Sequence, residues 1–200
     1  MSTFITILGA YLLGSLSFAV IVSRCMGMPD PHSYGSGNPG ATNVLRAGRK
    51  SAAALTLLGD ALKGWIAVWL ACRYQITWHL TNHTIAIVAV SVLLGHMWPV
   101  FFKFKGGKGV ATALGVLLAL SWPTALICTA IWLIMAFGFK VSSLAALIAT
   151  IISPFVAWWF IPQPSWIISV IVIDFLVLYR HKSNICKLLS GKESKIGQSE

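Results

Sequence analysis

A cluster of lysines and glycines lies in the stretch GHMWPVFFKFKGGKGVAT, residues 95–112, of a chain in which only 10% of residues are charged. Charges beside apolar segments are costly unless they reach an interface, a cavity or an anionic partner. Glycines let the backbone approach a ligand closely. The stretch therefore predicts an anion-binding loop, with anchoring to anionic lipid headgroups as the alternative. We assign to it Lys103, Lys105, Gly106, Gly107 and Lys108, and favour Lys108 as the direct ligand.

A second polar stretch, SGNPGATNVLR at residues 36–46, combines glycines with hydroxyl and amide side chains and ends on an arginine. A helix beginning near Ala41 would direct its first backbone N–H groups and its positive dipole end toward a ligand such as phosphate. The alternative is an ordinary surface loop, since the same residue types favour turns. The candidate ligands are Ser36, Gly37, Asn38, Gly40, Thr42, Asn43 and Arg46.

Further candidates flank the other apolar segments. His96 and His181 could donate to phosphate or move a proton near neutral pH, although a lone histidine is more often structural. Asn184 follows His181 in the basic tail. Ser142 and Ser143 begin an apolar segment, where serine serves as a helix cap or as an anion contact. No segment matches GxxxxGK[ST], so ATP-driven chemistry is disfavoured.

The elements that must position these residues are membrane spans. The chain has 200 residues, of which 57% are hydrophobic and nine are tryptophan, so it is no ordinary soluble domain. We predict an all-α, polytopic transmembrane helical bundle that forms a single domain over residues 1–200, with the order of the tail at 190–200 left open. Seven spans are expected, at about residues 4–22, 52–71, 84–101, 110–120, 125–139, 144–160 and 165–178.

Charge predicts the orientation of these spans. With seven spans, alternate loops place on one side all fifteen basic residues except Lys63 and Arg73. The positive-inside rule makes that side cytoplasmic and puts the N-terminus outside. The loops that carry candidate site residues fall on this same side, so they could form one site. The formal charge of +10 is explained by loop placement, and no nucleic-acid-binding module is recognisable.

One acidic and one basic residue lie inside the span expected at residues 52–71. Asp60 and Lys63 are three residues apart, which allows an ion pair that lowers the cost of burying both. The four cysteines show no metal-ligand spacing, and we expect neither a metal nor a cofactor.

Taken together, the ordered motifs closely resemble those of the bacterial acyl-phosphate:glycerol-3-phosphate acyltransferase family over nearly the whole chain. The matching segments are Ser36 to Asn43 with Arg46, Asp60-x-x-Lys63-Gly64, Gly95-His96 through Gly106 to Thr112, Val141-Ser142-Ser143, and His181-x-x-Asn184-Ile185. None of the five histidines is followed five residues later by Asp, so the HxxxxD dyad of the other acyltransferase class is absent.

The resemblance implies transfer of a fatty acyl group from acyl phosphate to the 1-hydroxyl of glycerol 3-phosphate, giving lysophosphatidate and inorganic phosphate. It implies a multi-pass enzyme of the bacterial inner membrane whose site faces the cytoplasm, in contact with membrane lipid and without an obligate protein partner. On this hypothesis the catalytic residues are Ser36, Asn38, Arg46, Lys108 and His181. The remaining candidates named above bind substrate.

Two rival functions fit parts of the pattern. A transporter for an anionic solute would also gather basic loops, but it predicts polar groups at the bilayer midplane and inverted-repeat halves, and no repeat is convincing. An alcohol phosphotransferase acting on a nucleotide-activated lipid would need several acidic metal ligands within a span. Asp60 and Asp174 are too few for such a site.

Overall fold

The computed structural model describes residues 1–196, and within that range its secondary structure is entirely helical. This confirms the predicted all-α class. The helices are α1 Ser2–Gly14, α2 Phe18–Cys25, α3 Ala41–Arg46, α4 Lys50–Arg73, α5 Asn82–Met97, the 3₁₀ helix η1 Val100–Phe102, α6 Val110–Leu120, α7 Trp122–Phe139, α8 Ser142–Phe160, α9 Pro164–Arg180 and α10 Lys182–Leu189.

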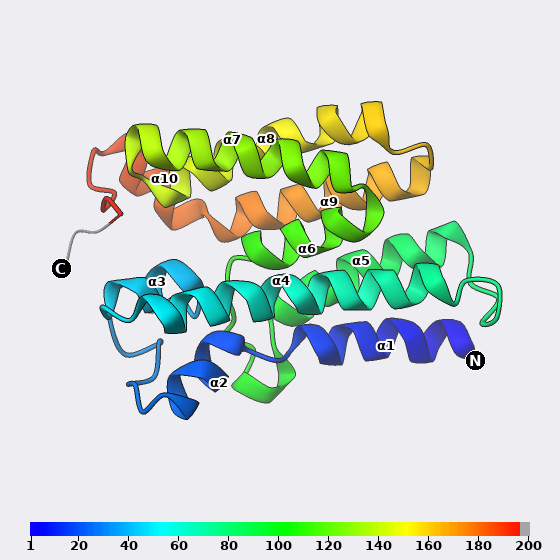
Figure 1. The fold of residues 1–200 in the computed structure, drawn as a ribbon, viewed down its shortest axis with the longest axis horizontal. Helices are drawn as coiled ribbons and strands as arrows, with labels where there is room; N and C mark the ends of the chain where they lie inside the picture. Colours follow the sequence, from blue (N-terminus) through cyan, green and yellow to red (C-terminus); the bar gives the residue numbers. More distant parts are fainter. Residues whose placement is uncertain (197–200) are drawn as a thin grey trace.

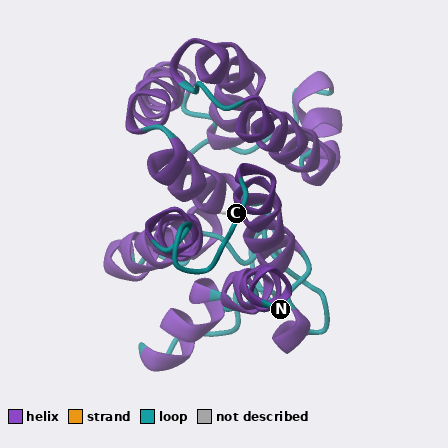
Figure 2. Ribbon diagram, turned by 90° about the vertical axis from the view of Figure 1, so that its right-hand side faces the viewer, coloured by secondary structure: helices purple, strands orange, loops and turns teal. Residues whose placement is uncertain are grey.

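The long helices run roughly along one axis of the molecule, and the start of α1 and helix α10 lie at opposite ends (Figure 1). Helices α1, α4 and α5 pack together, and α7, α8 and α9 form a second group. Helix α6 contacts α4 and α7, while α5 contacts α9, so these contacts join the two groups. Seen nearly end-on, the helices form a bundle with the connecting loops at its ends (Figure 2).

The membrane-spanning character is clear, but the number of spans is not fixed by helix length. Four helices, α4, α5 with η1, α7 and α8, are long and apolar enough to cross a membrane, and the count reaches six if α1–α2 and α9–α10 each form one bent span. Helix α6 is apolar but only 11 residues long, roughly 16 Å at 1.5 Å per residue, about half a hydrocarbon core. The count of seven spans and their orientation therefore stay predictions.

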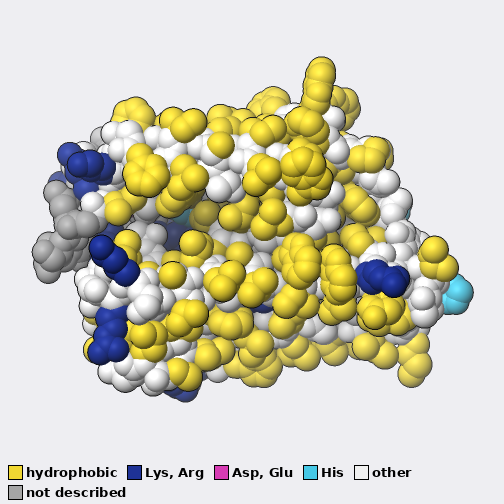
Figure 3. All heavy atoms as spheres, in the orientation of Figure 1, with side chains coloured by type: hydrophobic (Ala, Val, Ile, Leu, Met, Phe, Trp, Pro, Cys, Tyr) yellow, Lys and Arg dark blue, Asp and Glu magenta, His cyan; other side chains and the backbone are white. Residues whose placement is uncertain are grey.

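Basic side chains gather at the end of the bundle where α3 and α10 lie, and one further basic group lies at the opposite end (Figure 3). Hydrophobic side chains cover the surface between the two ends in this view. This distribution is the one expected for a bundle that crosses a bilayer with its basic loops on one side.

The first apolar segment is not the single helix expected over residues 4–22. It is bent by 46° between α1 and α2. The break frees the carbonyl of Leu16, which accepts a hydrogen bond from Nζ of Lys63 at 2.7 Å. A free backbone carbonyl in an apolar region needs such a donor, so the ammonium group of α4 stabilises the bend.

Lys63 and Asp60 form the ion pair that the sequence predicted. Their Nζ and Oδ1 atoms are 2.9 Å apart, and both side chains are buried. Nδ1 of His96 on α5 lies 3.5 Å from the same carboxylate oxygen. The pair thus connects α4 with the α1–α2 break and with α5.

Helix α6 packs against α4 through small residues. A Cβ on Gly115 would lie 1.9 Å from the carbonyl oxygen of Ala61, and a Cβ on Gly64 would lie 2.3 Å from that of Thr112. Oγ1 of Thr112 donates to the carbonyl of Asp60 at 3.0 Å. Small residues allow this close approach, as is common between helices in lipid. The contact fixes the position of the α6 N-terminus, directly after the lysine loop.

The buried ion pair yields a stability prediction. Replacing Asp60 by Leu leaves the Lys63 ammonium buried without its carboxylate, and we expect a loss of about 3–5 kcal/mol. Thermal unfolding in detergent should show a clear fall in Tm for Asp60→Leu and partial recovery in Asp60→Leu/Lys63→Met. Leu58→Ala on the exposed face of α4 is the control. A double variant as unstable as the sum of the two single variants would contradict the coupling.

Candidate active site

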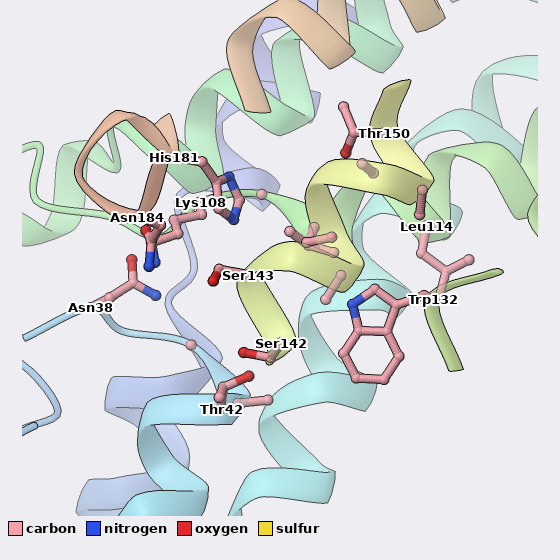
Figure 4. A pocket seen from close by; sticks show the side chains of 18 of the residues that line it. Asn38, Thr42, Lys108, Leu114, Trp132, Ser142, Ser143, Thr150, His181 and Asn184 are labelled. Carbon is pink, nitrogen blue, oxygen red and sulfur yellow. The ribbon is translucent and has the colours of Figure 1, made fainter. Parts of the chain in front are cut away.

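A cavity of about 310 Å³ opens among the basic loops and extends between the helices. Asn38, Lys108, His181 and Asn184 gather at one side of it, whereas Leu114 and Trp132 lie at the other (Figure 4). Of the seventeen residues predicted from sequence, twelve line it within the described part of the chain: Ser36, Asn38, Gly40, Thr42, Asn43, Arg46, His96, Lys108, Ser142, Ser143, His181 and Asn184.

The loop before α3 is organised by the buried side chain of Asn43. Its Oδ1 accepts hydrogen bonds from the Ser36 N–H at 2.9 Å and from the Ser36 hydroxyl at 3.2 Å. Its Nδ2 donates to the carbonyls of Pro31, at 2.8 Å, and Tyr34, at 3.2 Å. These bonds use most of the capacity of the Asn43 amide. Asn43 therefore holds Ser36 at the rim of the cavity.

The lysine loop is fixed in place by contacts to the backbone of its glycines. The N–H of Gly107 donates to the carbonyl of His96 at 3.1 Å. Arg180 donates from Nε to the carbonyl of Gly107 at 3.1 Å and from Nη2 to that of Gly106 at 2.6 Å. A Cβ on Gly107 would lie 2.2 Å from Nε2 of His96, so the close packing requires glycine. The next residue, Lys108, then enters the cavity.

Five predicted residues do not line the cavity in the described range. Lys103 and Lys105 are exposed, and the Lys105 carbonyl instead accepts a hydrogen bond from Nε2 of His32 at 3.1 Å. Gly106 and Gly107 are buried behind Lys108. Gly37 has a φ of +65° and supplies a turn that other residues adopt only with strain. We therefore propose structural roles for the three glycines.

The C-terminal segment closes one side of the cavity. Nδ1 of the buried His181 lies 2.8 Å from the carbonyl of Val177. Because a carbonyl only accepts, Nδ1 carries a proton, and in the neutral ring Nε2 is left as an acceptor. Asn184 Nδ2 and the Ser143 hydroxyl each donate to Oε1 of Glu193 at 2.6 Å. Arg46 donates from Nη2 to the Ser194 hydroxyl.

The Ser143 hydroxyl contacts a carboxylate and does not cap helix α8. Helix α8 begins at Ser142, its N-cap residue is Val141, and it has no side-chain cap. The Ser143 hydroxyl already contacts a carboxylate, that of Glu193, which shows that donors at this position suit an anionic oxygen.

The pKa of Lys108 is lowered toward neutral pH by its surroundings. Burial lowers the pKa of Lys108 to about 8, the nearby Glu193 carboxylate raises it, and the positive charge of Arg46 lowers it further. An anion bound beside the ammonium group would restore the charged form. Lys108 is thus suited to bind an anionic group that arrives from water.

The inner part of the cavity is mostly apolar. Leu114 and Leu117 of α6, Trp132 and Leu133 of α7 and Ala146 of α8 line it. Cationic, hydroxyl and amide groups at the mouth and an apolar interior together match an amphiphile with an anionic head.

The sequence did not single out Arg180 or Glu193. Arg180 was counted only among the basic residues of the cytoplasmic side, and its partners are backbone carbonyls that leave no mark in sequence. Glu193 could have been noticed as the first acidic residue after His181 and Asn184. The question of order in the tail concerned residues 190–200; residues 197–200 lie outside the described range.

This fold and cavity define a polytopic membrane protein whose cavity has basic and polar groups at its mouth and an apolar interior. The family model described as glycerol-3-phosphate acyltransferase matches residues 4–191, and the chain belongs to that family.

Curated relatives and solved structures agree with this membership. The chain is 68% identical over 190 residues to a glycerol-3-phosphate acyltransferase of Neisseria meningitidis serogroup C, covering 95% of each protein. It is 56% identical over 200 residues to that of Cupriavidus taiwanensis, covering 100% of this chain and 99% of the relative. The crystal structure of PlsY (YgiH), an integral membrane glycerol 3-phosphate acyltransferase, in its glycerol 3-phosphate form superposes with a TM-score of 0.91 at 38% identity, covering 98% of this chain and 96% of that one.

Titration of Lys108 gives a prediction for anion binding. Below its pKa of about 8 the side chain is charged, and above it the charge is lost. The affinity for inorganic phosphate, measured by calorimetry, should therefore fall by up to about tenfold per pH unit above this point. Arginine keeps its charge throughout, so Lys108→Arg should bind with an affinity nearly constant between neutral pH and the alkaline range. The same alkaline decline in both proteins would exclude Lys108 as its source.

Proposed function

We propose that the protein transfers a fatty acyl group from acyl phosphate to the 1-hydroxyl of glycerol 3-phosphate, releasing lysophosphatidate and inorganic phosphate. The observation that carries the proposal is a cavity in which cationic, hydroxyl and amide groups adjoin an apolar interior. Family membership supports the acceptor, since the relatives are named for glycerol 3-phosphate. A crystal structure of PlsY in a lysophosphatidic acid form supports the product.

The two phosphates would occupy neighbouring parts of the cavity mouth. We assign Ser36, Asn38 and Gly40, with Ser142 or Ser143, to the acyl-phosphate group and to the oxyanion that develops on its carbonyl. Arg46, Lys108 and Asn184 would hold the phosphate of glycerol 3-phosphate, and Nε2 of His181 would accept a hydrogen bond from one of its hydroxyl groups. Two phosphates repel each other, so cations between them are needed to hold both substrates at once.

The proposed reaction is a direct displacement. The 1-hydroxyl oxygen attacks the acyl carbonyl carbon and forms the ester bond, while the bond between that carbon and the bridging phosphate oxygen breaks. The hydroxyl proton passes to a phosphate oxygen of a substrate, and inorganic phosphate leaves. Acyl phosphate is an activated mixed anhydride, so positioning and charge stabilisation suffice without an acyl-enzyme. Oε1 of Glu193 accepts from both Ser143 and Asn184, and an anionic substrate oxygen would take its place on these donors when the site is occupied.

The setting of the reaction follows from the basic end of the bundle. We infer that this end faces the cytoplasm of a bacterial inner membrane, because the positive-inside rule orients multi-pass proteins that way. Glycerol 3-phosphate would enter from the aqueous side, while the acyl tail stays among the helices.

Purified protein in detergent tests the proposal directly. With dodecanoyl phosphate and glycerol 3-phosphate it should release inorganic phosphate and lysophosphatidate in equal amounts, and dodecanoyl-CoA should not replace the donor. Arg46→Gln should raise the KM for glycerol 3-phosphate by roughly tenfold or more, because a charge-assisted hydrogen bond is lost.

Arg49→Gln is the matched control, since Arg49 is exposed and bonds the Met26 carbonyl at 3.0 Å away from the cavity lining. Absence of phosphate release from the wild-type protein would defeat the enzyme assignment. An unchanged KM in Arg46→Gln would remove Arg46 from the acceptor site.

A further inference from the structure

The inner end of the cavity is closed by a polar pair that the proposed chemistry does not use. The Ser153 hydroxyl on α8 donates to Oδ2 of Asp174 on α9 at 2.6 Å. Both residues line the cavity, and their relative exposures are only 3% and 8%. A carboxyl group among membrane helices is costly, so its position at the end of an apolar channel calls for a role.

Beyond this pair the helices are packed. Leu120, Ala125, Ala157 and Val170 belong to the buried core. In the described part of the chain, none of these four lines the cavity. They occupy the next turn or two of α6, α7, α8 and α9 beyond the cavity-lining residues, so the channel ends at Ser153 and Asp174.

The length of the channel can be read along α8. Ser142 lies at the polar mouth and Ser153 at the closed end, and Ala146 and Ala149 line the cavity between them. The helix rises 1.5 Å per residue, so the two serines are separated by about 16 Å along its axis. A straight saturated chain that advances about 1.25 Å per carbon, from C–C bonds of about 1.5 Å, fits roughly a dozen methylenes in this length.

Selection by this channel would act through exclusion. The acyl chain comes from the bilayer, whose tails are as apolar as leucine side chains, so each methylene gains little by entering the channel. A chain longer than the channel must bend sideways past Leu57 and Leu133, exposed residues that also line the cavity, or press between Ser153 and Asp174. Separating this buried hydrogen bond leaves polar groups unsatisfied, which is the larger penalty.

We propose that the Ser153–Asp174 pair forms the floor of the acyl channel and limits the length of the acyl chain that the enzyme transfers. This inference rests on the proposed function, because it requires acyl phosphate as a substrate. It makes Ser153 and Asp174 specificity-determining residues remote from the reacting atoms.

The test is the chain-length profile of kcat/KM with saturated acyl phosphates from decanoyl to octadecanoyl. Wild-type activity should fall about tenfold at the first chains that exceed the channel, as expected for a misfit of one or two methylenes. Asp174→Ala, which lowers the floor, should move this fall to longer chains. Ala149→Leu, which fills the channel about 6 Å before the floor, should move it to shorter chains.

Two control variants accompany these. Asp174→Asn keeps an acceptor for the Ser153 hydroxyl and should keep the wild-type profile. Ala130→Leu makes the same change as Ala149→Leu at an exposed position of α7 outside the cavity lining, and should also leave the profile unchanged. Monodispersity and thermal unfolding in detergent show whether each variant is folded. If Asp174→Ala does not fold, the chain-length profile of Ala149→Leu tests the proposal.

The outcomes separate the two proposals. Product from every chain length with a flat wild-type profile, or unchanged profiles in Asp174→Ala and Ala149→Leu, would overturn the floor while leaving the acyltransfer in place. No product from wild-type protein with any acyl phosphate would instead overturn the proposed function.

Discussion

The site depends on the buried contact of Lys63, Asp60 and His96. Lys63 binds the carbonyl freed at the α1–α2 break, and Asp60 lies between Lys63 and His96. The backbone of His96 in turn accepts from Gly107. Arg180 secures the other side of the same loop through two carbonyls. A continuous set of polar contacts thus joins α1, α4, α5 and α9 behind the lysine loop and directs Lys108 into the cavity.

This arrangement suits the proposed reaction, in which two anionic substrates meet at a membrane surface. The cationic groups at the mouth are carried by α3, the lysine loop and α10, whereas the apolar channel is built from α6, α7 and α8. The short α6 lies between these parts, since the lysine loop precedes it and its side chains line the channel. Close contact of Gly115 and Gly64 with the neighbouring helix holds it there. The polar mouth and the apolar channel of the cavity are therefore positioned by one element.

Much of the fold and of the site could be predicted because their causes are local. Apolar runs predicted the long helices, and spacing predicted the Asp60–Lys63 pair. The distribution of basic residues predicted that the candidate loops lie at one end of the bundle. The break at Leu16 was missed because its backbone carbonyl accepts from Lys63, which lies 47 positions away in the chain. The contacts of the Gly106 and Gly107 carbonyls were missed for a similar reason, since the arginine that binds them lies 73 to 74 positions away in the chain.

Isotope exchange tests most directly the proposed direct acyl transfer between two substrates held in one cavity. Purified protein is incubated with acyl phosphate and labelled inorganic phosphate in the absence of glycerol 3-phosphate. We expect no label to enter acyl phosphate, because direct transfer forms no acyl-enzyme that phosphate could reverse. Label incorporation that depends on active enzyme and is lost in Ser36→Ala would contradict direct transfer and indicate a covalent intermediate.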